Sequence, residues 1–240
     1  MSASLKRPGG ELSTRPLHFF WIVDCSGSMQ GEKIGTVNFA IQSVIPEMVS
    51  AAEENPNAQL YVRALKFSSG ASWVTANPVK IEDYAWDDLD ADGPTDIGSA
   101  FELLAAQLTI PPMSDRALPP VLVLMSDGQP TDDYEEVLKH LLSLPWGKKS
   151  VRIAIAIGGD ADRDMLKEFT GNTELVLSAN TPASLVKLIK WASTVASTVS
   201  SLKSRVVESE GSSQDSSNVP VMVDLNSIPN QNEIDAGDVW

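Results

Sequence analysis

The sequence is poor in cysteine, in long apolar runs and in basic residues, and each shortage excludes a class of protein. Its single cysteine, Cys25, cannot form an internal disulfide. That fits a reducing compartment, so we expect a cytoplasmic protein. No stretch approaches the roughly 20 apolar residues of a membrane-spanning helix, so no membrane partner is expected. The segment before His18 holds no apolar run either, and we expect no secretory signal there.

The shortage of basic residues decides which partners the charge of the chain favours. There are 18 Lys and Arg residues against 32 Asp and Glu residues, for a net charge of -14. Nucleic-acid binding is excluded, because basic side chains must neutralise the phosphates and release their counterions. The acidic surface instead favours basic partners and cations. No Lys or Arg follows Arg205, whereas acidic residues continue to Asp238.

The composition nevertheless supports a folded domain, because 42% of the 240 residues are hydrophobic. A single domain of that size buries enough apolar surface to fold alone. We expect a flexible N-terminus over residues 1–15, one folded domain over 16–204 and an acidic, largely disordered tail over 205–240. The Ser-rich start of the tail offers too little apolar surface to offset the entropy of ordering. An apolar stretch, Val219–Leu225, and a terminal Trp240 follow it.

Short apolar segments alternate along the chain with segments that carry apolar residues at helical spacing. The predicted strands are His18–Cys25, Gln59–Phe67, Ala71–Thr75, Val121–Ser126, Val151–Ile157 and Glu174–Leu177. The predicted helices are Ile34–Ala52, Ile97–Leu108, Tyr134–Leu144, Arg163–Phe169 and Ala183–Leu202, with a kink or a break expected at Pro46. This alternation predicts a three-layer α/β/α sandwich with a doubly wound, mostly parallel sheet of about six strands, similar to the Rossmann fold.

Polar residues gather where the strands of this predicted sheet end. Asp24, Ser26 and Ser28 form a D-x-S-x-S pattern after the first strand, Thr95 precedes a helix, and Asp127 follows the strand Val121–Ser126. Such residues often do no more than cap helices. However, ligands in α/β folds bind beyond the carboxyl ends of the strands, where these three segments meet. Hydroxyl and carboxylate oxygens suit hard cations, and we therefore predict that these five residues bind Mg²⁺ or Mn²⁺.

On these motifs the chain resembles the von Willebrand factor A (VWA) family, in particular its bacterial tellurite-resistance and stress-associated type (TerY-like). The resemblance covers about Leu17 to Leu202 and includes the segments Leu124–Asp132 and Ile155–Asp160. Cys25 and Pro94 depart mildly from the family pattern. The resemblance implies a metal-ion-dependent adhesion site, abbreviated MIDAS. Its hydroxyl ligands would be Ser26, Ser28 and Thr95, with Asp24 and Asp127 often acting through water.

The same resemblance implies a function in protein binding. Three neutral ligands leave a dication short of negative charge, so an Asp or Glu carboxylate of a partner protein would complete the metal shell. The family context suggests an adaptor in a bacterial stress or tellurite-resistance system, alongside a Ser/Thr kinase and a PP2C-type phosphatase. The alternative within the binding class is an adaptor of an AAA+ ATPase of the MoxR or chelatase type. Both rest on analogy, because a fold does not determine a function.

We expect no enzymatic activity, because the motifs of the obvious enzyme classes are incomplete. A cysteine phosphatase needs an arginine about five residues after Cys25, and none is present in Ser26–Gly31. Ser26 replaces the second aspartate of an aspartyl phosphotransferase motif that would begin at Asp24. The chain has neither a G-x-S-x-G elbow nor a P-loop lysine motif. A metal-dependent phosphatase is the alternative enzyme.

Two acidic segments raise further hypotheses about cations. Asp88, Asp90 and Asp92 match the start of an EF-hand calcium loop, but Ser99 stands at the closing position where that loop has Glu. We therefore interpret the segment as a solvated acidic loop that attracts cations. In the tail, an Asp or Glu within 205–240 could occupy the open metal position of its own domain, as a brake on partner binding.

Overall fold

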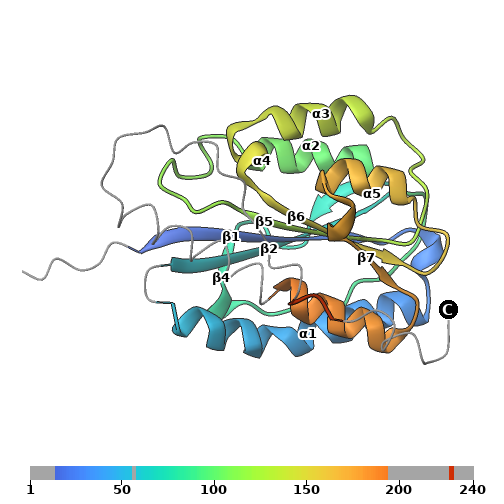
Figure 1. Cartoon of the computed structure of the whole chain (residues 1–240), viewed down its shortest axis with the longest axis horizontal. Helices are drawn as coiled ribbons and strands as arrows, with labels where there is room; N and C mark the ends of the chain where they lie inside the picture. The colour runs from blue at the N-terminus through green and yellow to red at the C-terminus, as the bar shows by residue number, and fades with distance from the viewer. Residues whose placement is uncertain (1–13, 56–57, 194–226, 230–240) are drawn as a thin grey trace, which may run out of the picture.

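A single mixed sheet forms the middle layer of the computed structural model, which describes residues 14–55, 58–193 and 227–229 (Figure 1). Among these residues seven strands pair, in the order β3-β2-β1-β5-β6-β7, with β4 also pairing to β2. The strands are β1 (Arg15–Asp24), β2 (Ala58–Ser68), β3 (Gly70–Trp73), β4 (Val79–Lys80), β5 (Val121–Ser126), β6 (Val151–Ile157) and β7 (Val176–Ala179). The predicted sheet is confirmed, with the two-residue strand β4 in addition.

The strands owe their parallel pairing to burial on both faces. β1, β2, β5, β6 and β7 run parallel, and only β3 and β4 pair antiparallel to β2. All six residues of β5 are buried, as are the last six of β1. Neighbouring side chains of β1 point to opposite sides, with Trp21 in one apolar cluster and Phe20 in the other. A strand with two covered faces therefore has a continuous apolar sequence.

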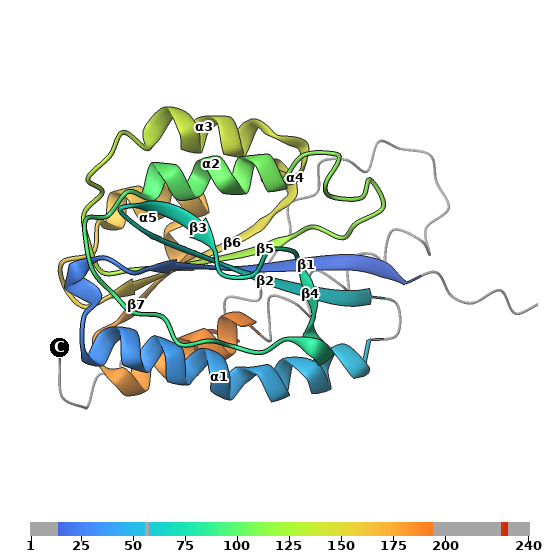
Figure 2. The same ribbon diagram turned by 180° about the vertical axis from the view of Figure 1, so that it is seen from behind.

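Helices cover both faces of the sheet, and Figures 1 and 2 show the two layers. On one side lie α1 (Glu32–Glu53) and a helix that starts at residue 182 and continues to 193, where the described segment ends. On the other side lie α2 (Ile97–Gln107), α3 (Glu135–Ser143), α4 (Pro145–Lys149) and α5 (Arg163–Thr170). Short 3-10 turns occupy Gly27–Met29, Ile81–Asp83 and Thr173–Leu175. The predicted three-layer α/β/α arrangement is thereby confirmed.

Helix α1 runs through Pro46, so of the kink or break predicted there the break is wrong. Buried Ile41, Val44 and Met48 lie on both sides of the proline and pack into the core. Pro46 itself is exposed, so the carbonyl oxygen that its missing N–H leaves unpaired can bind water. Packing of the apolar face therefore outweighs the local effect of the proline, as it does for most helices in proteins.

Most of the predicted flexible ends, 1–15 and 205–240, lie outside the described residues, and their boundaries remain predictions. Residues 227–229 are the described part of the predicted tail. There the indole Nε1 of Trp191 donates a hydrogen bond of 3.1 Å to Ser227 Oγ, and Ile228 packs against the core cluster on the α1 side of the sheet. Within the described ranges no helix is both long and apolar enough to span a membrane.

Candidate metal site

Three loops meet at the carboxyl edge of the sheet and carry the five residues of the predicted metal site. Asp24 is the last residue of β1, and Asp127 follows β5 directly. These two strands are parallel neighbours with Val23 opposite Met125, so the loops that follow them start side by side. Thr95 lies two residues before α2 and reaches the same edge, because the neighbouring Gly93 accepts a hydrogen bond of 2.9 Å from the N–H of Gly27.

Asp24 is fully buried and held by two hydrogen bonds. Its Oδ1 accepts the backbone N–H of Ser26 at 2.8 Å, and its Oδ2 accepts the hydroxyl of Ser126 at 2.6 Å. Burial raises the pKa of Asp24, the bonds from Ser126 and Ser26 oppose that rise, and the charge of Asp127 adds to it. The carboxyl group is thus fixed in place and short of positive charge, a condition that a bound cation would relieve.

The two serines of the first loop connect to Asp127. The hydroxyls of Ser26 and Ser28 lie 3.1 Å apart, and Ser28 Oγ donates a bond of 2.7 Å to Asp127 Oδ1. Asp127 Oδ2 accepts a hydrogen bond from the ammonium of Lys33 at 2.5 Å. These contacts therefore form one chain that joins the first loop, the loop after β5 and helix α1; its members are Ser26, Ser28, Asp127 and Lys33.

The space beside Gly128 shows how closely the oxygens from the three loops converge. A Cβ placed on Gly128 would lie 3.3 Å from Thr95 Oγ1, 3.6 Å from Ser28 Oγ and 3.9 Å from Asp24 Oδ2. Asp24 and Ser28 come from the end of β1 and its loop and Thr95 from the loop before α2, and one point lies within 4 Å of all three oxygens. The missing side chain at Gly128 leaves room for a small ligand at that point.

Thr95 is positioned by the loop that follows Asp127. The hydroxyl of Thr131 accepts the N–H of Thr95 at 2.9 Å and donates to Asp96 Oδ1 at 2.9 Å. The backbone N–H of Thr131 in turn donates to Thr95 O at 3.0 Å. Asp96 Oδ2 also accepts the N–H of Gly70. Bonds to the backbone N–H and carbonyl of Thr95 thus link its loop to the loop after Asp127 and hold the residue in place.

Asp132 caps helix α2 from another loop. Its Oδ1 accepts the N–H of Gly98 at 3.1 Å and its Oδ2 accepts the N–H of Ser99 at 3.2 Å. Both donors belong to the first turn of α2, whose N–H groups have no partner within the helix. A Cβ on Gly98 would lie only 2.8 Å from Asp132 Oδ2, so glycine is needed there. This cap fixes the start of α2, and with it Thr95.

The donor set fits a hard divalent cation. Hydroxyl and carboxylate oxygens of Ser26, Ser28, Thr95, Asp24 and Asp127 gather in one place and include neither sulfur nor imidazole. Oxygen ligands of this kind suit Mg²⁺ and Mn²⁺. Among the described residues no group of three or more His, Cys, Asp or Glu side chains could hold a metal. A metal site at this edge therefore depends on the hydroxyls.

Four residues that shape the site were not predicted from the sequence. Ser126 is the last residue of β5, and Thr131 and Asp132 lie in the loop after it; the motif there does not indicate that they bind Asp24, Thr95 and α2 respectively. Lys33 gives no sequence signal, because a lysine at the start of a helix usually lies in solvent. Its contact with Asp127 depends on how α1 leaves the first loop.

The acidic segment beside the site is a solvated loop, as the sequence analysis interpreted it. Asp88, Asp90 and Asp92 are exposed, and within the described ranges they form no three-ligand group. Buried Asn38 holds the segment from α1: its Nδ2 donates to Leu89 O at 2.9 Å, and its Oδ1 accepts the N–H of Leu89 at 3.0 Å. The carboxylates therefore lie on the surface next to the loop that carries Thr95.

Cys25 and His18, side chains of the types that nucleophilic and acid–base catalysis use, lie in unfavourable surroundings. Cys25 is buried, and burial, with a smaller contribution from Asp24, raises the pKa of its thiol to about 12, so the thiolate is scarce at neutral pH. His18 stands six residues before Asp24 on β1, about 20 Å away in an extended strand. Burial lowers its pKa to about 4.

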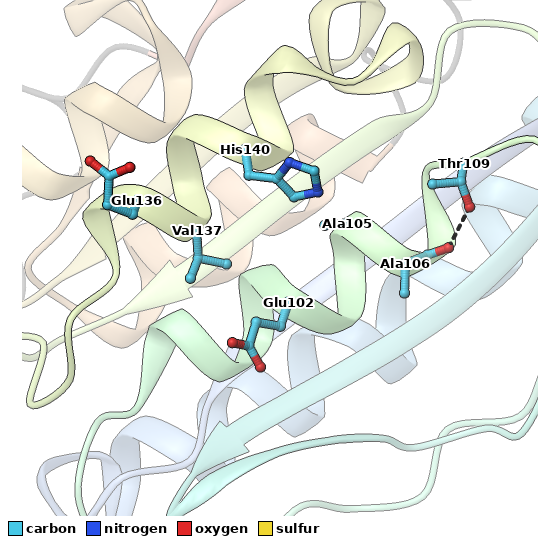
Figure 3. Close-up of a pocket in the computed structure, with 7 residues that line it drawn as sticks. All are labelled: Glu102, Ala105, Ala106, Thr109, Glu136, Val137 and His140. Atoms are coloured by element: carbon cyan, nitrogen blue, oxygen red, sulfur yellow. Dashed lines mark hydrogen bonds between the residues drawn. The ribbon is translucent and has the colours of Figure 1, made fainter.

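His140 lines a separate open groove of about 480 Å³ between α2 and α3 (Figure 3). Its neighbours there are Glu102, Ala105, Ala106, Thr109, Glu136 and Val137. In Figure 3 the carboxylate of Glu136 points away from the imidazole. The groove brings together no set of ligands or nucleophile and base.

Comparison with known proteins gives one family. The sequence profile of the von Willebrand factor type A domain matches residues 20–191, which are 172 of the 240 residues. No curated protein sequence matches the chain significantly. The matched range includes all five predicted metal ligands and both helical layers.

Solved structures share the fold at low sequence identity. A von Willebrand factor type A protein from Catenulispora acidiphila is 14% identical, with a TM-score of 0.54 over 77% of this chain and 43% of the other. Proximal thread matrix protein 1 from the mussel byssus, solved with a zinc-occupied MIDAS motif, is 16% identical, with a TM-score of 0.54 over 78% and 47%. The pilus adhesin SpaC from Lactobacillus rhamnosus GG is 14% identical, with a TM-score of 0.60 over 77% and 30%. The chain thus spans less than half the length of each.

Proposed function

Since the chain belongs to the von Willebrand factor type A domain family, we propose that it binds a partner protein through a divalent cation. The fold of this family is used for metal binding and protein interaction. The cation would be held by Asp24, Ser26, Ser28, Thr95 and Asp127. The observation that carries this proposal is the convergence of the Thr95, Ser28 and Asp24 oxygens within 4 Å of one point beside Gly128.

The residues of the site have separate tasks in this proposal. The hydroxyls of Ser26, Ser28 and Thr95 would be the direct ligands. Asp24 and Asp127 already accept protein hydrogen bonds on both of their oxygens, which favours contact with the cation through water. A bound dication would supply positive charge that attracts an anionic oxygen of the partner. An Asp or Glu carboxylate is the partner group that fits.

We favour Mg²⁺ or Mn²⁺ as the cation, because the donors are hard oxygens. The mussel protein with zinc at its MIDAS motif makes zinc the natural competitor. A rise in thermal stability with Mg²⁺ or Mn²⁺ would support the assignment. If zinc gives such a rise and Mg²⁺ and Mn²⁺ do not, the preference is contradicted.

The binding function is tested by capturing partners on the immobilised full chain. Cell lysate is passed over the wild type in Mg²⁺, the wild type in EDTA, and a Thr95→Val variant in Mg²⁺. Valine keeps the branched shape and leaves the backbone bond to Thr131 in place, so it removes one ligand with little change in the fold. The proposal expects a protein held only by the metal-loaded wild type. Equal capture in all three samples would contradict it.

We also propose that the protein is not an enzyme. The buried Cys25, the distance of His18 from the site along β1 and the position of His140 in a separate groove support this. The alternative is a metal-dependent phosphatase, for which the same carboxylates could serve. Hydrolysis of a generic phosphoester with Mn²⁺ that is lost in an Asp24→Ala variant would establish the alternative.

The narrower context rests on the likeness of the segments Leu124–Asp132 and Ile155–Asp160 to TerY-like proteins. On that basis we propose a cytoplasmic adaptor in a bacterial stress or tellurite-resistance system with a Ser/Thr kinase and a PP2C-type phosphatase. Kinase and phosphatase genes beside the gene would support it. A neighbouring AAA+ gene would favour the ATPase adaptor instead.

A further inference from the structure

A lysine is built into the edge of the candidate metal site. Lys33 is the second residue of α1, and its Nζ lies 2.5 Å from Asp127 Oδ2. The Asp127 side chain is completely buried and that of Lys33 is 21% exposed. The same ammonium would lie 3.8 Å from a Cβ on Gly158, so the end of the side chain is also enclosed by the loop after β6.

The position of Lys33 is not explained by the stability of α1. A cation in the first turn of a helix is unfavourable, because the N-terminal end of the helix carries partial positive charge. The pairs Lys139–Glu136 and Lys190–Glu47 lie at the surface, where an ion pair contributes little. The contact of Lys33 with a buried carboxylate instead changes the charge of the site itself.

The charges of the site can be added up from these contacts. Asp24 and Asp127 contribute two negative charges, and Lys33 offsets one of them. A divalent cation would therefore bring the local sum to plus one, whereas without Lys33 the sum would be zero. A site with a positive sum holds its cation less tightly and attracts an anionic group more strongly.

From this arrangement we infer that Lys33 adjusts two affinities of the site. It weakens the binding of the dication, and it provides a second positive group for the carboxylate of the partner. This inference rests on the proposed metal-dependent binding. It assigns to Lys33 two effects of opposite sign, on the metal and on the anion. A residue that merely stabilises the fold would not produce such a pair of effects.

The size of each effect follows from Coulomb's law. Even at the dielectric constant of water, one unit charge roughly 6 to 10 Å from a dication changes an affinity by about three- to tenfold, and the burial of the site raises this figure. We therefore expect Lys33→Gln to bind Mn²⁺ about three- to tenfold more tightly than the wild type. The Mn²⁺-loaded variant should bind a carboxylate more weakly by a similar factor.

The experiment uses Mn²⁺ and acetate as probes on the full chain. Calorimetry gives the Mn²⁺ affinity, and water-proton relaxation of the Mn²⁺-loaded protein gives the acetate affinity, because acetate displaces metal-bound water. Lys33→Arg keeps the charge and should behave like the wild type. Lys139→Gln removes an exposed lysine whose side chain is 77% accessible, and it controls for overall charge. Circular dichroism shows that each variant is folded.

The outcomes separate this inference from the proposed function. Tighter Mn²⁺ binding together with weaker acetate binding in Lys33→Gln, and in neither control, supports the inference. If the wild type binds Mn²⁺ and Lys33→Gln leaves either affinity unchanged, the inference is overturned and the proposed function stands. If the wild type binds no Mn²⁺, the proposed function fails, and the inference fails with it. Should Lys33→Gln not fold, Lys33→Met, which also removes the charge, replaces it, and the same two outcomes support or overturn the inference.

Discussion

Replacing Gly128 with alanine should block the candidate metal site without unfolding the protein. Gly128 has no positive φ, so its backbone conformation is open to alanine. The new methyl group would lie 3.3 Å from Thr95 Oγ1, a tight contact that a shift of a few tenths of an ångström relieves. Loss of glycine also lowers the entropy of the unfolded chain, an effect of about 0.4 to 1 kcal/mol in favour of folding. We expect the metal-free melting temperature to stay near that of the wild type.

The effect on metal binding should be much larger. The methyl group would fill space within 3.9 Å of three oxygens of the candidate site. In our proposal the cation, its water or the partner carboxylate needs this space. With a dissociation constant of about 1 mM, 10 mM Mg²⁺ stabilises the wild type by about 1.4 kcal/mol through mass action. That corresponds to a rise of roughly 3 to 6 °C in the melting temperature of a domain of this size. In Gly128→Ala the rise should fall below about 1 °C, which corresponds to an affinity at least tenfold weaker.

Differential scanning fluorimetry with and without Mg²⁺ measures both quantities. Gly159→Ala is the matched control, because it lies in the loop after β6, has no positive φ and would place its Cβ with nothing within 4 Å. Its response to Mg²⁺ should equal that of the wild type. A full response in Gly128→Ala would refute the assignment of the metal to this space, and a loss of response in both variants would show a general effect of the substitution.

Two further predictions concern the surroundings of the site. Thr131→Val removes the hydroxyl that accepts the Thr95 N–H and donates to Asp96. Chemical denaturation should show a loss of about 1 kcal/mol in the free energy of unfolding, and Mg²⁺ should bind less tightly. An unchanged Mg²⁺ affinity would show that Thr131 does not position Thr95. The pKa of His18 is lowered from 6.5 to about 4, so the unfolded chain binds the extra proton between these values and stability is lost as the pH falls below 6.5. Between pH 7 and pH 5 the free energy of unfolding of the wild type should fall by about 2 kcal/mol more than that of His18→Phe. The variant keeps an aromatic ring between Phe20 and Tyr61. Equal losses would contradict the burial of a neutral imidazole.

The sheet could be predicted from the sequence because its central strands are buried on both faces. Val121–Ser126 and Val151–Ile157 are apolar almost throughout, and the structure gives them the predicted bounds. The two-residue strand β4 carries no such pattern. Of the kink or break predicted at Pro46, the break does not occur, because a local rule does not include the packing of Ile41 and Met48 against the core.

The site could be predicted only as far as its motifs reach. Asp24, Ser26 and Ser28 lie within five residues, and the parallel pairing of β1 with β5 brings them to the loop of Asp127. The hydrogen bond from Gly27 to Gly93 brings the loop of Thr95 to the same place. The partners of these residues could not be predicted, because they depend on distances between loops. The Lys33–Asp127 pair joins residues 94 apart in the chain, and the bond from Ser126 to Asp24 joins residues 102 apart.

The central claim is that one divalent cation binds among Asp24, Ser26, Ser28, Thr95 and Asp127. Electron paramagnetic resonance at room temperature tests it directly, because the sharp signal of free Mn²⁺ disappears when the ion binds to protein. Titration of the full chain should show one bound Mn²⁺ per chain that Mg²⁺ displaces. A variant with both Ser28→Ala and Thr95→Val should bind none at the same concentrations. Equal binding by this variant and the wild type, or no binding by the wild type at millimolar Mn²⁺, would contradict the account.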